Sequence, residues 1–236
     1  MLNYADDIIL VAPSSNTLCL PAEISHITSW ATSNNLKLNL SKTHELIIVP
    51  KGSRSKTFIR PHLLPAVQRV TSMTLLGVVL QDNLSMDGHV SAAVSKGAQS
   101  LFALKTLSAH GLTDFSLYCA CMAILVSRLT YTLSFWFGFA TSENIGRIQS
   151  VLNKACRWRL TGGRSLPSVL ELSASGDSTL FKTVTSNPSH VLSQYLPDLK
   201  PRAHNLRPKS HNFTLPKCTT MRSRNFLHRM LYKNMY

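Results

Sequence analysis

Acidic side chains are scarce in this 236-residue chain, which holds 11 Asp and Glu residues against 25 Lys and Arg residues. The formal charge at pH 7 is therefore 25 − 11 = +14, and the isoelectric point is near 9.9. This balance favours a polyanionic partner, with a basic protein that has no such partner as the plainer alternative. Hydrophobic residues make up 44% of the chain, which is enough to bury a core and excludes disorder over the whole length.

Two further features are missing from the sequence. Asp6 and Asp7 interrupt the first apolar run, so no hydrophobic region typical of a secretory signal opens the chain. The five cysteines are scattered and odd in number, which is a poor framework for disulfide bonds. We therefore expect a reducing, intracellular location, nuclear or cytoplasmic, and no secretion.

The hydrophobic pattern predicts an α+β fold in three parts. Residues 1–82 are rich in strand patterns and residues 83–197 in helical patterns. Residues 198–236 form a basic tail, in which the stretch from Leu199 carries nine Lys or Arg residues and no acid. The tail also contains three prolines, and we expect it to be extended and poorly ordered except at Ser223 to Tyr232.

The first two parts differ in the elements that we expect. The first should contain a β-hairpin over residues 2–11, a helix from Pro21 to Asn34-Asn35, strands over 36–40 and 46–49, and a hairpin of 67–70 with 75–80. The second should contain helices from His89 to about Gly111, over 145–157, and a short one from Leu166-Pro167. The first part is thus a partial antiparallel sheet with a helix, and the second is a helical domain.

Residues 117–140 are the most apolar stretch, and their length permits a membrane span. Arg128 lies near the centre of the stretch, where a charge in a bilayer costs about 2.5–3.5 kcal/mol. A buried helix of the helical domain is therefore favoured over a membrane protein, and we expect no membrane partner. The segment from Leu129 to Phe139 also alternates with a period of two, so a strand stays open as an alternative.

Asp6 and Asp7 are the residues that point most directly to chemistry. Neighbouring carboxylates repel each other, so a fold that keeps them usually pairs them with a cation. Hard divalent ions such as Mg²⁺ prefer oxygen ligands, and two such ions can stabilise both oxygens of a displacement at phosphorus. A solvated Asp-Asp turn is the alternative, but the apolar residues on both sides favour a strand–turn–strand that presents the two acids.

The sequence Tyr4-Ala5-Asp6-Asp7, followed by an apolar strand, resembles the central polymerase motif of reverse transcriptases. The nearest likeness is to the non-LTR, LINE-type retrotransposon enzymes of jockey-like kind. Later segments resemble successive parts of the same family: Leu38 to Thr43 the next palm motif, Leu75 to Val90 the entry to the thumb, Leu129 to Trp136 and Arg147 to Arg157 the helices that follow, and Leu215 to Tyr232 the end of such reading frames. The likeness covers nearly the whole chain.

The resemblance implies an RNA-directed DNA polymerase that uses an RNA template, a DNA primer and Mg²⁺ or Mn²⁺. Asp6 and Asp7 would bind the metal and, with Lys42, form the catalytic set, Lys42 acting on the leaving pyrophosphate. An exposed lysine at a strand end is an equal alternative for Lys42. Tyr4 would brace the hairpin near the primer end.

The resemblance also implies residues that contact nucleic acid. Leu76 and Gly77 would belong to the primer grip, with a β-bulge as an equal alternative for Gly77. The helical domain would add Arg147, Lys154, Arg157 and Trp158. Because Trp158 stands between two arginines, it is the best candidate for stacking on a base, whereas Trp30 is expected in the core.

Family members place fingers and an upstream palm, with the first metal-binding aspartate, before the acidic pair. This chain begins shortly before Tyr4, so we expect a C-terminal fragment comprising a palm remnant (1–82), a thumb and connection region (83–197) and the tail (198–236). Alone it should be inactive. A basic, non-catalytic nucleic-acid-binding remnant is the alternative function.

Overall fold

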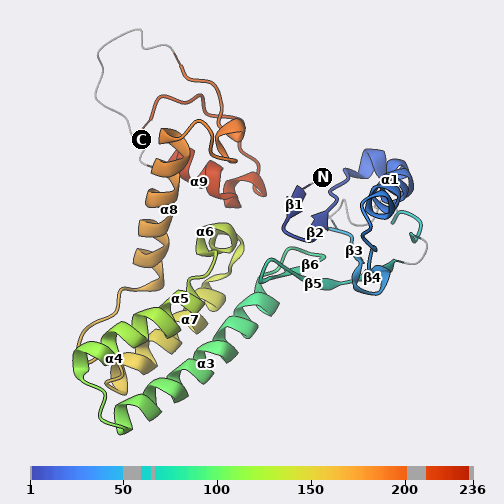
Figure 1. The fold of residues 1–236 in the computed structure, drawn as a ribbon. Coiled ribbons are helices and arrows are strands. Elements are labelled where there is room, and N and C mark those ends of the chain that lie inside the picture. Colours follow the sequence, from blue (N-terminus) through green and yellow to red (C-terminus); the bar gives the residue numbers. More distant parts are fainter. Residues whose placement is uncertain (1, 50–59, 65–66, 201–210, 234–236) are drawn as a thin grey trace. The chain divides into compact units, whose positions relative to one another are not determined.

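The computed structural model describes residues 2–49, 60–64, 67–200 and 211–233 (Figure 1). These residues form an α+β fold, which confirms the class predicted from the sequence. The chain divides into two compact units, one of residues Met1–Leu75 and Leu80–Leu84, the other of residues Leu76–Val79 and Ser85–Tyr236.

The first unit is built from short strands and one long helix. Its elements are β1 (Leu2–Tyr4), β2 (Asp7–Ile9), a 3-10 segment (Ser14–Cys19), α1 (Leu20–Ser33), a 3-10 turn (Leu40–Lys42), β3 (His44–Leu46), β4 (Gln68–Val70) and β5 (Ser72–Leu75), with β6 (Val78–Gln81) shared between the units. Three two-stranded sheets connect the described strands, β1 with β2 antiparallel, β3 with β4 parallel, and β5 with β6. The partial antiparallel sheet that we expected is thus divided, among the described residues, into small two-stranded sheets, of which β3 with β4 is parallel.

Two predicted strands differ from the structure for local reasons. The strand expected over 36–40 is absent, because Asn35 takes a left-handed conformation (φ 56°) and the chain then enters the 3-10 turn at Leu40–Lys42. The strand expected over 46–49 lies earlier, as β3 (His44–Leu46), so the prediction and the structure share only Leu46. Leucines alternating with polar residues are typical of a strand, but here nothing in the described chain pairs with them.

We expected strands 67–70 and 75–80 to pair as a hairpin, and this pairing is wrong. β4 pairs with β3 in parallel, and the hairpin is instead β5 with β6. Leu76 and Gly77 reverse the chain between them, both with positive φ (47° and 82°). Two such residues give the tight turn that matches the twist of a hairpin, and Leu76 looked like part of a continuous strand because leucine seldom occupies this position.

Helix α1 has an apolar face that the described residues hardly cover. Its helical spacing places Ile24, Ile27, Trp30 and Ala31 on one face, yet only Ala31 is buried. Trp30 is 56% exposed, so its prediction as a core residue is wrong.

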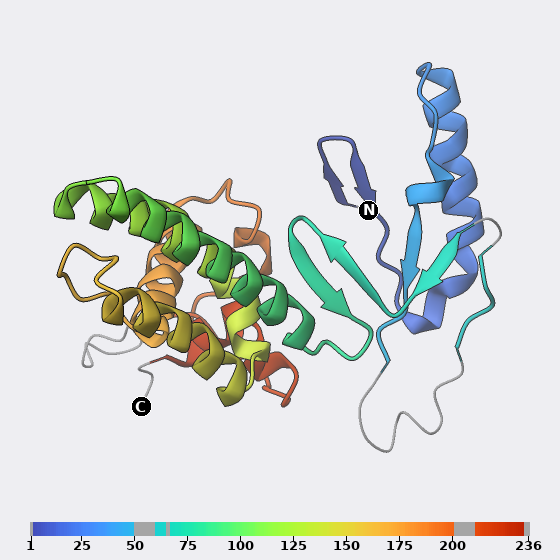
Figure 2. The same cartoon turned by 90° about the horizontal axis from the view of Figure 1, so that it is seen from below.

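The second unit is helical. Its elements are α3 (Asp87–Ala109), α4 (Asp114–Ala120), a π-helical segment (Cys121–Val126), α5 (Ser127–Leu129), α6 (Leu133–Trp136), a 3-10 segment (Phe137–Phe139), α7 (Ser142–Arg157), α8 (Val169–Ser186), 3-10 turns (Ser193–Tyr195 and Arg222–Arg224) and α9 (Phe226–Tyr232). Helices α3 and α7 lie side by side in both views (Figure 2). Gly97 on α3 allows this approach, since a Cβ there would lie 3.1 Å from side-chain atoms of both Leu129 and Val151.

The apolar stretch 117–140 supplies much of the core of this unit. Its residues Leu125, Leu129 and Trp136 are almost completely buried. The stretch is helical, and Thr132 (φ 50°) separates α5 from α6, so the strand alternative is wrong. By length and composition Asp114–Phe139 would suffice to cross a membrane, but the core helices of many proteins meet the same test.

Helix α8 is longer than the short helix expected from Leu166-Pro167. It begins after Ser168, whose hydroxyl accepts a hydrogen bond from the Glu171 amide at 3.2 Å while the Glu171 carboxylate accepts one from the Ser168 amide at 2.7 Å. This capping box satisfies two amides of the first turn and sets the start of the helix.

Residues 211–233 of the basic tail pack against α8. α9 buries Phe226, Met230 and Leu231, in the stretch expected to be ordered, and Arg229 donates a hydrogen bond of 2.7 Å to Asp177 on α8. The tail is therefore only in part the extended segment that we expected. Residues 201–210 and 234–236, which belong to the same prediction, lie outside the described residues.

Candidate functional site

The acidic pair lies at the turn of the β1–β2 hairpin. Leu2 pairs with Ile9 and Tyr4 pairs with Asp7, which leaves Ala5 and Asp6 as a two-residue turn. Ala5 has a left-handed conformation (φ 51°), which an alanine seldom adopts. Asp6 and Asp7 are both exposed, so the predicted hairpin with its acids facing solvent is confirmed.

The hairpin offers only part of a metal site. The carboxylates of Asp6 and Asp7 have no hydrogen bond or ion pair with another described residue. In the described part of the chain no three His, Cys, Asp or Glu side chains come together as a metal-binding group. Since two-metal centres take ligands from more than one segment, these two carboxylates alone do not complete such a centre.

The other residues predicted in the first unit are exposed. Tyr4 is 63% exposed on β1. Lys42 ends the 3-10 turn, where its backbone amide donates a hydrogen bond of 3.3 Å to the side chain of Asn39. Its ammonium group has no partner among the described residues and makes no contact with the acidic pair. This agrees with the alternative that Lys42 is simply an exposed lysine.

Leu76 and Gly77 form the turn between β5 and β6 and belong to the second unit. The Tyr131 hydroxyl donates a hydrogen bond of 3.0 Å to the Leu76 carbonyl. A Cβ on Gly77 would lie 3.0 Å from Cε1 of Tyr131. The β-bulge considered for Gly77 is therefore wrong, because the residue is part of a turn against which an aromatic ring packs.

The four residues predicted on and after α7 divide into two groups. Arg147 is half-buried and donates a hydrogen bond of 2.9 Å to Ser91 on α3, which gives it a contact between helices. Lys154, Arg157 and Trp158 are exposed at the C-terminal end of α7. Cations there also interact favourably with the helix dipole, so their position has a structural reason besides any ligand.

An arginine that the sequence analysis did not single out lies beside this end of α7. The Arg164 guanidinium stacks over the rings of Phe115 (5.2 Å to the centroid) and Tyr118 (4.9 Å), both on α4. The loop before Arg164 contacts the start of α4 so closely that a Cβ on Gly162 would collide with the Asp114 carbonyl. Gly162-Gly163 predicted only a helix end, and no sequence signal linked Arg164 to α4.

We define the basic–aromatic surface as the exposed residues at this end of the second unit, namely Phe115, Lys154, Arg157, Trp158, Arg159 and Arg164. Trp158 is 50% exposed and Phe115 is 64% exposed. The surface thus combines four cations with two accessible rings. Proteins that bind single-stranded nucleic acids use cations to contact phosphates and aromatic rings to stack on bases.

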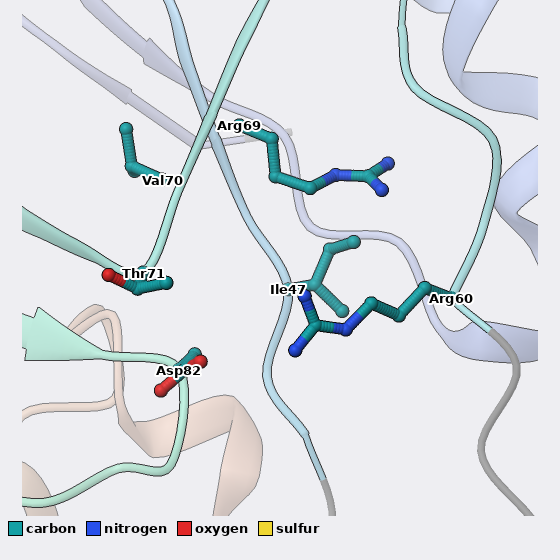
Figure 3. Close-up of a pocket in the computed structure, with 6 residues that line it drawn as sticks. All are labelled: Ile47, Arg60, Arg69, Val70, Thr71 and Asp82. Atoms are coloured by element: carbon teal, nitrogen blue, oxygen red, sulfur yellow. The ribbon is translucent and has the colours of Figure 1, made fainter.

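A small hollow of about 240 Å³ lies in the first unit (Figure 3). Arg60 and Arg69 lie on either side of Ile47, and Asp82 lies apart from them near Thr71. Arg69 is already engaged, since it donates to Glu45 (2.6 Å) and to the carbonyls of two residues. The hollow carries charges of both signs and none of the predicted catalytic residues.

The sequence-predicted residues therefore fall into separate places. Tyr4, Asp6 and Asp7 share one hairpin, and Lys42 lies in the same unit without a contact to them. The turn at Leu76-Gly77 and the end of α7 belong to the second unit. Comparison with models of known families, with curated proteins and with solved structures finds no match for this chain.

Proposed function

We propose that the chain is part of an RNA-directed DNA polymerase of the non-LTR retrotransposon kind, with residues 1–82 as a palm remnant and 83–197 as a thumb region. The observation that carries the proposal is the β1–β2 hairpin, which exposes Asp6 and Asp7 at its turn beside Tyr4. A polymerase needs carboxylates held at a rigid, accessible turn, where a metal ion can meet the phosphates of a nucleotide.

The uncovered face of α1 supports the proposal. Ile24 and Ile27 are only half-buried and Trp30 is exposed, although apolar residues at helical spacing normally face a neighbouring element. On this proposal, the fingers and upstream palm that family members place before the acidic pair would cover this face.

On this proposal Asp6 and Asp7 would hold Mg²⁺ or Mn²⁺ and Lys42 would act near the leaving pyrophosphate. The metal would stabilise the charge that develops at the phosphorus. The two carboxylates of this chain are too few to hold a complete two-metal centre. We therefore expect the 236-residue chain to show no primer extension on poly(rA)/oligo(dT) with either metal. Template-dependent incorporation that Asp6→Asn abolishes would contradict this expectation.

A metal titration tests the proposal at the hairpin itself. Mn²⁺ added to the ¹⁵N-labelled chain with an RNA/DNA primer–template should broaden the amide signals of residues 4–9 at micromolar concentrations. Asp6→Asn with Asp7→Asn should remove the broadening, and the matched control Glu23→Gln should leave it unchanged. Broadening that is the same in the double variant and in wild type would overturn the proposal.

The basic–aromatic surface favours a second candidate, a nucleic-acid-binding module without chemistry. If about four to six phosphates are neutralised, log K for single-stranded RNA should fall with log[salt] at a slope of about −3 to −4. Arg157→Gln and Arg159→Gln together should flatten the slope by about 1.4, whereas Lys105→Gln on α3 should not change it. This candidate alone is supported if RNA binds without any Mn²⁺ effect at the hairpin.

Deleting the basic tail would not test this second candidate cleanly. Removing 199–236 takes away nine cations, but it also removes α9 and Arg229, the partner of the buried Asp177. A change in the salt slope could then reflect loss of folded structure, so single substitutions of exposed cations are the better test.

A further inference from the structure

A second hollow, of about 370 Å³, lies within the helical unit between α8 and the C-terminal segment. One face of α8 forms one wall, and residues around 211–213 and the end of α9 form the rest. The lining residues are Ser178, Phe181, Lys182, Thr185, His211, Phe213, Met230 and Lys233. It shares no residue with the hairpin or with the basic–aromatic surface, so it is a separate place in the molecule.

The aromatic wall of the hollow is fixed by its own contacts. The His211 ring lies edge-on to Phe181 with centroids 5.8 Å apart, and it is tilted against Phe213 at 5.4 Å. His211 Nε2 donates to the Leu231 carbonyl at 2.9 Å, and Nδ1 accepts from the Phe213 amide at 3.2 Å. Both ring nitrogens are thus engaged, which fixes the His211 ring against the two phenyl rings.

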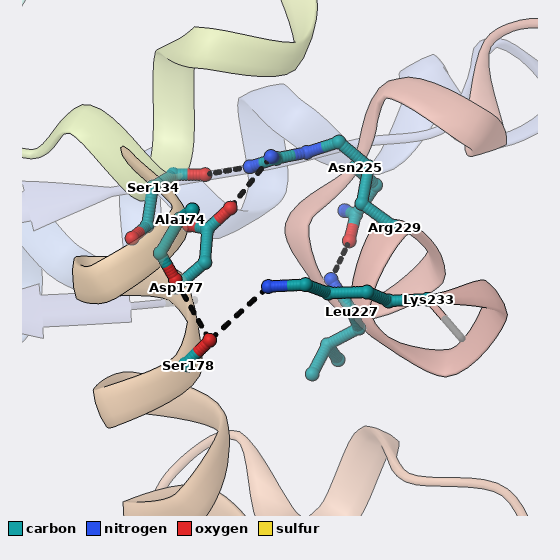
Figure 4. A network of polar contacts seen from close by, with 8 residues as sticks. All are labelled: Ser134, Ala174, Asp177, Ser178, Asn225, Leu227, Arg229 and Lys233. Carbon is teal, nitrogen blue, oxygen red and sulfur yellow. Dashed lines mark hydrogen bonds and ion pairs between the residues drawn. The ribbon is translucent and has the colours of Figure 1, made fainter. Parts of the chain in front are cut away.

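Two cationic side chains, Lys182 and Lys233, line the hollow, and none of the described residues that line it is acidic. The Lys233 ammonium donates to the Ser178 hydroxyl at 3.1 Å (Figure 4), which holds it at the α8 side. The ammonium of Lys182 has no hydrogen bond or ion pair with any described residue.

The nearest acid on α8 is directed elsewhere. Asp177 precedes Ser178, but its carboxylate accepts a hydrogen bond of 2.7 Å from Arg229, which also donates to the Ser134 carbonyl at 2.9 Å (Figure 4). The Asp177 side chain is 5% exposed. The Asp177 carboxylate is therefore engaged by Arg229 and not by Lys182.

We propose that this hollow binds a small aromatic anion, in which a flat ring carries a phosphate or sulfonate group. The ring would contact Phe181 and Phe213, and the anionic group would pair with Lys182, with Lys233 beside it. Small-molecule sites typically join an apolar lining with a few charged groups that fix orientation, and pairing with an ammonium strengthens each hydrogen bond to an anionic oxygen.

1-Naphthyl phosphate is a probe that contains both parts, while 1-naphthol and inorganic phosphate each contain one. Titrated into the ¹⁵N-labelled full chain at low salt, the probe should shift amide signals of residues 178–185, 211–213 and 230–233. Both half-probes should bind at least tenfold more weakly. Equal affinity for naphthol and naphthyl phosphate would overturn the proposal, because no anion site would then be needed.

Substitutions assign the contacts. Lys182→Gln should raise the dissociation constant of naphthyl phosphate at least fivefold, and Phe181→Leu should weaken naphthyl phosphate more than inorganic phosphate. The matched control Lys105→Gln removes one exposed lysine of the same unit far along α3 and should leave affinity unchanged. If Lys182→Gln and Lys105→Gln have the same effect while both spectra stay folded, the probe responds only to net charge and the proposal fails.

Discussion

The Tyr131 hydroxyl donates a hydrogen bond of 3.0 Å to the backbone carbonyl of Leu76, and the two residues are 55 positions apart in the sequence. Tyr131 lies in the turn between α5 and α6, and its own carbonyl accepts a hydrogen bond of 2.9 Å from Nε1 of the buried Trp136. The turn of the β5–β6 hairpin is in this way connected to the core of the helical unit. Any strand of nucleic acid that reached Leu76 and Gly77 would meet a backbone whose position Tyr131 fixes.

Replacing Gly77 by alanine should destabilise the helical unit more than the same change at Gly111. Both glycines have nearly the same φ (82° and 83°), where an alanine costs about 1–2 kcal/mol. Only at Gly77 would the new Cβ press against Tyr131, at 3.0 Å, whereas nothing lies within 4 Å at Gly111. We expect an additional cost of about 1 kcal/mol or more for Gly77→Ala from overpacking. Urea denaturation of both variants measures the difference, and equal costs would mean that Tyr131 moves aside freely.

The ion pair between Asp177 and Arg229 should be essential for the packing of the C-terminal segment. Asp177→Ala leaves Arg229 half-buried without its carboxylate, which should cost about 3–5 kcal/mol. The control Asp198→Ala removes an exposed acid and should change stability by less than about 0.5 kcal/mol. Limited proteolysis should then cleave within 211–233 in the Asp177 variant first. A cost below about 1 kcal/mol would indicate that the buried apolar residues Phe226, Met230 and Leu231 hold α9 without help from the ion pair.

Stability should fall below neutral pH in part because of His89. Burial, and secondarily Lys96, lower the pKa of His89 below its ordinary value of 6.5, and its Nδ1 accepts a hydrogen bond of 3.4 Å from the Val79 amide. The unfolded chain takes up the proton first as pH drops below about 6.5, so the folded state loses stability until the folded-state pKa is passed. Above pH 6.5 both states are neutral and this contribution is constant.

The size of the pH effect is about 1.4 kcal/mol for each unit by which the pKa is lowered. His89→Gln should therefore show a flatter decline of unfolding free energy between pH 7.5 and 5.5 than wild type. The control His110→Gln, at the exposed end of α3, should keep the wild-type slope. His228, whose pKa is also lowered by burial and by Arg222, would remain in both variants and account for a residual decline.

Elements with a strong local signal were predictable from the sequence. The hairpin around Asp6, helix α1 after Pro21, α3 up to Gly111 and α7 all follow from periodicity and capping residues. These elements need no knowledge of distant partners. The exposed acids at the hairpin turn were predictable for the same reason, because the apolar flanks and the polar pair are contiguous.

Features that depend on distant residues were not predictable. The parallel pairing of β3 with β4 brings Glu45 to Arg69 at 2.6 Å, but short strands carry no signal of their partner. The stacking of Arg164 over Phe115 depends on where the loop after α7 meets the start of α4. Trp30 has the helical spacing of a core residue and still lies exposed, because burial requires a covering element and periodicity shows only which face is apolar.

Trp30 and Trp136 offer a comparison between the two units with the same side chain. Trp136 is fully buried in the helical unit, whereas Trp30 is 56% exposed on α1. Trp136→Ala should cost about 3–5 kcal/mol through lost contacts and a cavity, and Trp30→Ala should change stability by no more than about 0.5 kcal/mol.

Hydrogen exchange of the wild-type chain should show the same difference between the units. The amides of α3 and α7 should exchange slowest. Those of α1 should exchange at a rate close to that of local opening, because few buried contacts protect them. Similar costs for the two variants, with equal protection of α1 and α3, would show that another surface covers α1 in solution and that the first unit is as stable as the second.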